Sequence, residues 1–159
     1  MSASPAVEGW FTTGPEPTLL GSRCTTCATV YFPPVPHDRG GFCRNPDCEG
    51  TEFEAVPLSR TGRIWSYTNA CYQPPEPFVA PDPYVPFAIA AVELDKEKMI
   101  VLGQVVAGVD VAELAVGMPV ELVLETLYRD GEQDKLIWKW RPLPAAKATS
   151  ASASAGVTR

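Results

Sequence analysis

The stretch that decides the fold reads Cys24-Thr-Thr-Cys27 and, after 15 further residues, Cys43-Arg-Asn-Pro-Asp-Cys48. Two short cysteine pairs at this separation are typical of a four-thiolate zinc ribbon. Each pair sits on a tight turn, and a hairpin brings the turns together so that four sulfurs form a tetrahedron. Threonines fill the first pair, and Asn, Pro and Asp inside the second favour a turn. The expected metal ligands are Cys24, Cys27, Cys43 and Cys48.

Disulfides and free thiols are the alternatives for these cysteines. Residues 1–5 have neither the basic region nor the apolar run of a secretory signal, so we expect a cytoplasmic protein. Disulfides rarely persist in that compartment, which favours zinc. Because four cysteines leave no coordination position open, we expect a structural and not a catalytic metal.

The composition indicates a small globular chain of acidic character. It has 159 residues, 45% of them apolar, and a formal net charge of −6. No apolar run approaches the length of a membrane span, so no membrane partner is expected. Residues 1–59 carry three Lys/Arg against seven Asp/Glu, and residues 60–142 carry eight against twelve. Neither part has a basic stripe, which argues against an electrostatic nucleic-acid binder.

Strand patterns divide the chain after the cysteines. Longer strands rich in aromatic and β-branched residues begin at Thr61, and Asp110 is positioned to cap a short helical turn through Leu114. Five strands with a helical element between the third and the fourth are the layout of an OB-fold barrel. The expected strands are 18–23, 30–32 and 51–58 in the ribbon, then 62–69, 87–94, 99–106, 120–125 and 135–140 in the barrel, with a turn over 129–134.

The sequence therefore predicts a mostly β protein in four parts. These are an N-terminal arm (1–17), a rubredoxin-like zinc ribbon (18–59), a five-stranded OB-fold barrel (60–142) and a disordered tail (143–159). The tail is expected to be disordered because it is a low-complexity run of Ala, Ser and Thr. In the arm, Trp10 and Phe11 are expected to pack, either on the ribbon or on a partner.

Aromatic residues around a proline-rich loop are the candidate binding residues. Six prolines lie between Pro74 and Pro86, and long loops with aromatics are often functional or form interfaces. Tyr84 and Phe87, at the exit of this loop, are the better contact candidates. Trp65 and Tyr67 lie in the preceding strand, where a contact role and a place in the barrel core are equally compatible with the sequence.

Catalytic residues are not expected in this chain. Cys71 lies outside the cysteine quartet, and a nucleophilic cysteine needs a base. The only histidine, His37, belongs to the other module and is expected in an exposed loop. Paired carboxylates fall in predicted turns, where solvated charge is the usual explanation.

Several segments together resemble a known family: the acyl-CoA-associated zinc-ribbon plus OB-fold proteins, long described as a domain of unknown function. The resemblance covers roughly residues 8–142 and departs in an enlarged stretch after Pro34. The matching segments are the two cysteine pairs, Phe32-Pro33-Pro34, Gly62-Arg63-Ile64-Trp65-Ser66-Tyr67-Thr68, Pro83-Tyr84-Val85-Pro86-Phe87-Ala88, Val92-Glu93-Leu94 and Gly117-Met118-Pro119-Val120-Glu121.

The resemblance implies an accessory role beside a thiolase-fold enzyme of the lipid-transfer-protein type. In such pairs the partner carries out retro-aldol cleavage or condensation of a CoA thioester, in steroid side-chain or other lipid metabolism. The barrel is then expected to help bind acyl-CoA, through Tyr84, Phe87, Tyr67 and Trp65. A single-stranded nucleic-acid-binding module is the alternative, because ribbons and OB-folds often bind single strands through aromatics. The aromatics fit that alternative, whereas the charge does not.

Overall fold

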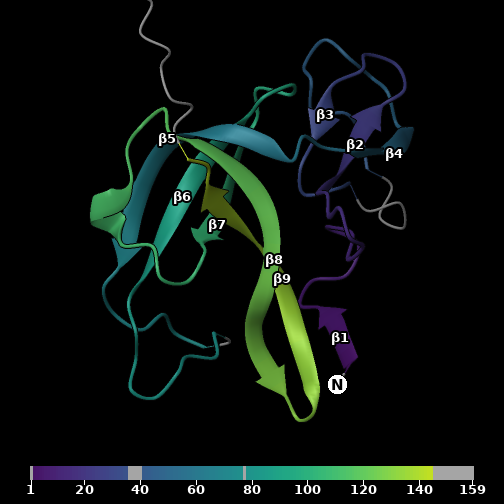
Figure 1. Cartoon of the computed structure of the whole chain (residues 1–159). Helices are drawn as coiled ribbons and strands as arrows, with labels where there is room; N and C mark the ends of the chain where they lie inside the picture. Colours follow the sequence, from purple (N-terminus) through teal and green to yellow (C-terminus); the bar gives the residue numbers. More distant parts are fainter. Residues whose placement is uncertain (1, 36–40, 77, 145–159) are drawn as a thin grey trace, which may run out of the picture.

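The computed structural model describes residues 2–35, 41–76 and 78–144, and they form two β modules (Figure 1). A three-stranded sheet has the order β3-β2-β4, and a six-stranded sheet has the order β1-β9-β7-β6-β5-β8. The elements are β1 (Ser2–Pro5), β2 (Leu20–Cys24), β3 (Val30–Tyr31), β4 (Phe53–Pro57), β5 (Thr61–Ala70), β6 (Phe87–Leu94), β7 (Ile100–Val105), η2 (Val111–Glu113), β8 (Pro119–Asp130) and β9 (Gln133–Pro142).

The larger sheet closes into a five-stranded barrel because β8 and β9 pair with each other as well as with β5 and β7. Most neighbours are antiparallel, but β7 and β9 run parallel and pair only at Gln104–Lys139 and Val105–Trp140. The predicted mostly β fold, with a ribbon followed by a five-stranded OB-fold barrel, is confirmed.

Alternation along the strands fills the barrel. Ile64, Val92 and Val101 lie in one row across β5, β6 and β7, and all three are buried. Trp140 and Leu122, paired across β9 and β8, have no exposed surface. The core is therefore made by one face of each strand, as period-2 patterning requires.

The helical element between the third and fourth barrel strands is a single 3₁₀ turn, η2. Asp110 caps it by accepting a hydrogen bond from the Ala112 N–H at 2.8 Å. The Glu113 carboxylate accepts from the Asp110 N–H at 2.8 Å, which completes a capping box. This is the turn predicted from Asp110.

Two segments differ from expectation. The predicted turn over 129–134, centred on Asp130-Gly131, is found, but it is tighter than expected: β8 continues to Asp130, β9 begins at Gln133, and the chain reverses at Gly131 and its neighbour, with Gly131 at φ 60°. Arg129 and Asp134 oppose each other there, and their ion pair at 2.8 Å supports the extension. The N-terminal residues add β1, which runs parallel to β9 along this hairpin (Figure 1).

An aromatic cluster joins the arm, the ribbon and the barrel. Trp138 of β9 is its centre, with ring centroids 5.7 Å from Phe11, 5.8 Å from Phe32 and 6.2 Å from Trp10. Phe11 is almost fully buried. The expected packing of Trp10 and Phe11 is thus found at the junction of the two modules, where it holds them together.

The structure leaves part of the sequence undescribed. The predicted loop histidine, His37, lies outside the described residues, and so does nearly all of the predicted tail. Leu143 is described, and its N–H donates to the Pro119 carbonyl at 2.9 Å. Among the described residues, no helix is long and apolar enough to cross a membrane.

Candidate metal centre and barrel surface

The four cysteines of the two pairs converge on one point of the ribbon. Their Sγ atoms all lie within 4.8 Å of one another, with Cys24 and Cys48 3.9 Å apart and Cys27 and Cys43 3.5 Å apart. A tetrahedral zinc site with Zn–S bonds of about 2.3 Å needs sulfurs about 3.8 Å apart. The arrangement of Cys24, Cys27, Cys43 and Cys48 therefore fits zinc.

Turn geometry aims these sulfurs inward. Cys24 ends β2, and its carbonyl accepts from the Ala28 N–H at 2.9 Å, which curls the first pair into a tight turn. In the second pair the Cys48 N–H donates to the Asn45 carbonyl at 3.0 Å. Gly50 passes close behind, because a Cβ built there would lie 2.8 Å from Cys24 Sγ. Only glycine leaves room for the sulfur.

Neighbouring hydroxyl groups support the sulfurs. The Thr29 hydroxyl lies 3.1 Å from Cys27 Sγ, and this contact, together with a backbone hydrogen bond of Thr29, lowers the pKa of the Cys27 thiol to about 6. The Tyr31 hydroxyl lies 3.0 Å from Cys43 Sγ. Burial beside the other thiols raises the pKa of Cys48, so the four thiols do not all ionise readily without a metal, and binding of zinc as thiolates releases their protons. Four thiolates leave no place for a substrate, so zinc here would act as a tetrahedral cross-link that stabilises the ribbon.

The structure separates the four aromatic residues predicted to bind ligand. Trp65 lies at a β-bulge of β5 and is 59% exposed. Tyr67 is 37% exposed and shares a row with Ala90 and Gly103, which belong to the inner face of the sheet. Trp65 and Tyr67 are therefore not core residues. Because the bulge adds one residue to β5, they lie on opposite faces of the sheet.

The other two candidates, Tyr84 and Phe87, hold the proline-rich loop against the barrel. The Tyr84 hydroxyl donates to the Ala70 carbonyl at 2.7 Å, and burial, followed by the nearby Cys71, raises the pKa of Tyr84. Phe87 stacks on Phe78, with ring centroids 5.6 Å apart. Both side chains are half-buried. Their contact with a ligand stays a prediction.

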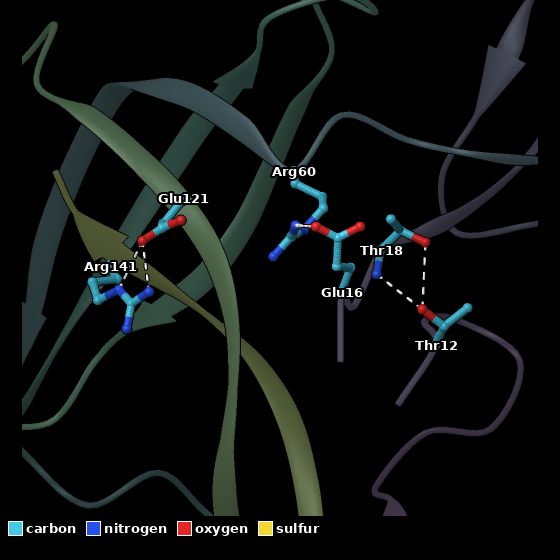
Figure 2. A network of polar contacts seen from close by, with 6 residues as sticks. All are labelled: Thr12, Glu16, Thr18, Arg60, Glu121 and Arg141. Atoms are coloured by element: carbon cyan, nitrogen blue, oxygen red, sulfur yellow. Dashed lines mark hydrogen bonds and ion pairs between the residues drawn. The ribbon is translucent and has the colours of Figure 1, made fainter. Parts of the chain in front are cut away.

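A groove lies beside the N-terminal arm, and Figure 2 shows two of its arginines, Arg60 turned toward Glu16 and Arg141 turned toward Glu121. It has a volume of about 370 Å³, and two arginines line it. Arg60 pairs with Glu16 at 3.3 Å, and Arg141 pairs with Glu121 at 2.6 Å. Each positive charge has its own carboxylate, so the groove offers no unbalanced positive charge to an anion.

Sequence reasoning missed one exposed feature of the barrel. Ile100 and Leu102 of β7 are exposed, although the run Met99 to Val106 was expected only as a strand. The available signal was the apolar character of alternate positions that face away from Val101. When both faces of a strand are apolar, its outer face exposes apolar side chains to water, and such exposed apolar surface is typical of an interaction site.

Two known protein-family models match the ribbon and the barrel of this chain separately. Residues 14–54 match the family model described as the rubredoxin-like zinc ribbon domain of ChsH2, and residues 55–125 match the C-terminal OB-fold domain of ChsH2. A DUF35 domain-containing scaffold protein of Methanocaldococcus jannaschii is 34% identical over 79% of this chain and 82% of its own length. The chain belongs to the ChsH2 zinc-ribbon and OB-fold family.

Further relatives of this ChsH2-type chain are subunits of larger systems. A probable enoyl-CoA hydratase alpha subunit of Thermomonospora curvata is 32% identical over 77% of this chain, and a benzoylsuccinyl-CoA thiolase subunit, BbsA, of Thauera aromatica is 41% identical over 35% of it. In both comparisons the match spans 34% of the relative's length. A solved structure titled Ltp2-ChsH2(DUF35) aldolase superposes with a TM-score of 0.58, at 30% identity, covering 79% of this chain and 84% of that one.

Proposed function

We propose that this chain is an accessory subunit of a thiolase-like acyl-CoA enzyme. The observation that carries the proposal is the agreement of relatives matched over most of the chain. One is named a scaffold protein, and a structure 30% identical to this chain is titled as an aldolase containing ChsH2. A shorter match is to a subunit of a CoA thiolase.

The distribution of chemical groups supports an accessory and not a self-sufficient role. Cys71, the one cysteine outside the quartet, is exposed on the surface. The cysteine quartet forms a closed thiolate site, which suits folding and not catalysis. In this proposal the ribbon (18–59) is the rigid end piece, the barrel (60–142) meets the enzyme, and the arm (1–17) ties the two together.

The reaction of the complex is proposed to be carbon–carbon bond cleavage or formation on a CoA thioester. Retro-aldol cleavage by a lipid-transfer-protein-like partner is the favoured form, with steroid side chains or other lipids as the acyl group, in the cytoplasm. The thiolase and aldolase names of the relatives support this class of reaction. Catalytic groups would come from the partner subunit.

Acyl-CoA contact by this chain is a separate part of the proposal. Trp65 is the most exposed of the four candidates, so its indole is open to a ligand unless a partner subunit covers it. Tyr84 and Phe87 would act by fixing the loop that borders a ligand, since their rings already have partners within the chain. Tyr67 is less exposed than Trp65 and pairs with the buried Ala90, so it is a weaker candidate for ligand contact.

The test is purification of the tagged chain from its own cells, with bound proteins identified by mass spectrometry. Zinc and nucleic acid are assayed in the same sample. A stoichiometric thiolase-like subunit that cleaves or condenses an acyl-CoA only in the presence of this chain is the expected result. Recovery of the chain alone, or with nucleic acid and no such enzyme, would contradict the proposal.

A further inference from the structure

The outer surface of three neighbouring barrel strands carries exposed apolar side chains at its centre. At the bulge of β5, the register passes from Ile64–Val92 directly to Ser66–Ala91, so Trp65 is the extra residue between these pairs. Trp65 follows the buried Ile64 and is 59% exposed, so its side chain lies on the outside of the barrel. Ala91 in turn pairs with Leu102 of β7. Side chains in one row point to one face, and this face is opposite to that of Ile64 and Val92, which fill the core.

We call this surface the outer face, and its members are Trp65, Ile89, Ala91, Ile100 and Leu102. Leu102 is 64% exposed, and Ile100 is also exposed. A small hollow lies within the face, lined by Ser66, Thr68, Ile89, Ala91, Leu102 and part of Tyr67. Flat apolar surface with a hollow between exposed side chains is the form in which a partner's side chain packs.

Charge is confined to one end of the outer face. Glu93 lies in the same row as Ile100 and Arg63, and Lys98 pairs with Glu93 at 3.8 Å. Arg63 donates to the Gly117 carbonyl at 3.0 Å. The rows further along the strands, from Ser66 to Leu102 and from Thr68 to Gln104, are uncharged. An apolar centre with charged groups at its edge is the anatomy of a protein–protein interface.

We propose that the outer face is the docking surface for the thiolase-like subunit. This inference rests on the proposed function, because that function supplies the partner. It assigns the contact to one face of the barrel, with Leu102 and Trp65 as its central side chains. Large apolar side chains at the centre of an interface contribute most of the binding free energy.

A second copy of this chain fits the outer face less well than a larger enzyme does. The exposed parts of Trp65, Ile100 and Leu102 amount to roughly 350 Å², given that a large side chain presents about 150–250 Å². Two copies meeting through this face would bury less than the roughly 1,200 Å² of a stable interface. Each copy also has a net charge of −6, which opposes self-association. A larger partner can extend the contact onto the neighbouring loop.

The test uses the full chain produced together with the thiolase-like subunit that the wild type recovers. Leu102→Asp and, independently, Trp65→Asp place a charge in the centre of the face. Leu102→Met keeps an apolar side chain there. Phe42→Asp is the matched control, because Phe42 is 71% exposed but lies in the ribbon. Thermal stability and zinc content are measured for every variant.

Both Asp variants are expected to weaken binding of the subunit on the order of tenfold or more. Leu102→Met and Phe42→Asp are expected to bind as the wild type does, and all variants should melt at similar temperatures. Wild-type binding by folded Asp variants would overturn the docking surface while leaving the accessory role intact. Retained assembly with lost activity would indicate ligand contact instead, and altered self-association alone would indicate a homodimer. If the wild type recovers no thiolase-like subunit, the proposed function itself fails.

Discussion

The indole Nε1 of Trp138 donates a hydrogen bond of 3.0 Å to the backbone carbonyl of Leu102. This contact crosses the barrel where β7 and β9 have not yet begun to pair, since their ladder starts only at Gln104. The same indole is the centre of the cluster that holds Trp10, Phe11 and Phe32. One side chain thus closes the barrel and fastens the ribbon and the arm to it.

Trp138→Phe should separate these two roles. A phenyl ring keeps part of the packing but cannot donate to Leu102, and a single hydrogen bond contributes about 1 kcal/mol. Trp138→Ala also removes the centre of the aromatic cluster, for which a loss of about 3–5 kcal/mol is expected. Urea unfolding of both variants measures the difference, and equal losses would show that the hydrogen bond is the whole effect.

Gly103→Ala should destabilise the barrel through overpacking. A Cβ at this position would lie 2.7 Å from Trp140 Nε1 and 3.0 Å from Trp138 Nε1. Rigid indoles in a packed core cannot move aside easily, so we expect a loss of about 1–3 kcal/mol in the free energy of unfolding.

Gly14→Ala is the control for this substitution, because nothing lies within 4 Å of a Cβ built there. Its stability should stay within about 0.5 kcal/mol of the wild type. Equal effects at the two glycines in urea titrations would contradict the proposed crowding at Gly103.

Local patterns in the sequence predict much of this fold. The spacing from Cys24 to Cys48 indicates the ribbon because ligand geometry depends on nearby residues. Alternation indicates the barrel strands, and Asp110 marks the start of η2 because capping is a local interaction. Each of these features is decided by residues close together along the chain.

Contacts between segments far apart in the sequence could not be predicted from local patterns. Ser2–Pro5 has little β-propensity, and it forms β1 because the edge of β9 is available to it. The bulge at Trp65 shifts the alternation of β5 by one residue, so the row of Tyr67 could not be obtained by counting from Ile64. The position of Trp138 between arm and ribbon likewise depends on the closed barrel.

Removal of zinc should unfold the ribbon and leave the barrel largely folded. The ribbon is small, so the metal contributes much of its folding free energy. The purified chain should contain about one zinc ion. Cys48→Ser should lower this content and change the fluorescence of Trp10, whose ring centroid lies 5.7 Å from that of Phe32.

The matched control for zinc loss is Cys71→Ser, because Cys71 is exposed and stands apart from the quartet. That variant should keep the zinc content and the fluorescence of the wild type. A Cys48→Ser protein with full zinc content would show that the metal is held in another way.

The attachment of the proline-rich loop should weaken at alkaline pH. Burial raises the pKa of Tyr84, so the folded state holds the phenolic proton more tightly than the unfolded state does. The resulting stabilisation is complete below the ordinary tyrosine pKa of about 10 and is lost as the pH rises through the higher folded value.

Tyr84→Phe removes this titration together with the hydrogen bond to Ala70. Its stability relative to the wild type should therefore improve as the pH rises from 8 to about 11. Tyr72→Phe is the comparison, since Tyr72 is strongly exposed, and it should show no such trend. A constant gap between Tyr84→Phe and the wild type in urea unfolding would contradict the role of Tyr84.

Replacing Lys139 should lower the free energy of unfolding, because its ion pair with Glu125 and its aliphatic stem are largely buried. Lys139 is 9% exposed, and its Nζ lies 3.0 Å from Glu125 Oε2, which also accepts from the Ala107 N–H at 3.3 Å. Lys139→Ala leaves a carboxylate without its cation and a space where the aliphatic stem was packed. We expect a loss of about 2–4 kcal/mol.

Lys139→Met keeps the stem volume, so its loss should be smaller, about 1–2 kcal/mol, because water can reach the part of Glu125 that is exposed. Adding Glu125→Gln to Lys139→Met removes the unpaired charge while an amide oxygen still accepts from Ala107. The double variant should therefore be more stable than Lys139→Met in urea unfolding. Two results together would contradict this account. They are equal losses in the free energy of unfolding for Lys139→Met and Lys139→Ala, and no gain on adding Glu125→Gln; the pair would then act only as a surface contact.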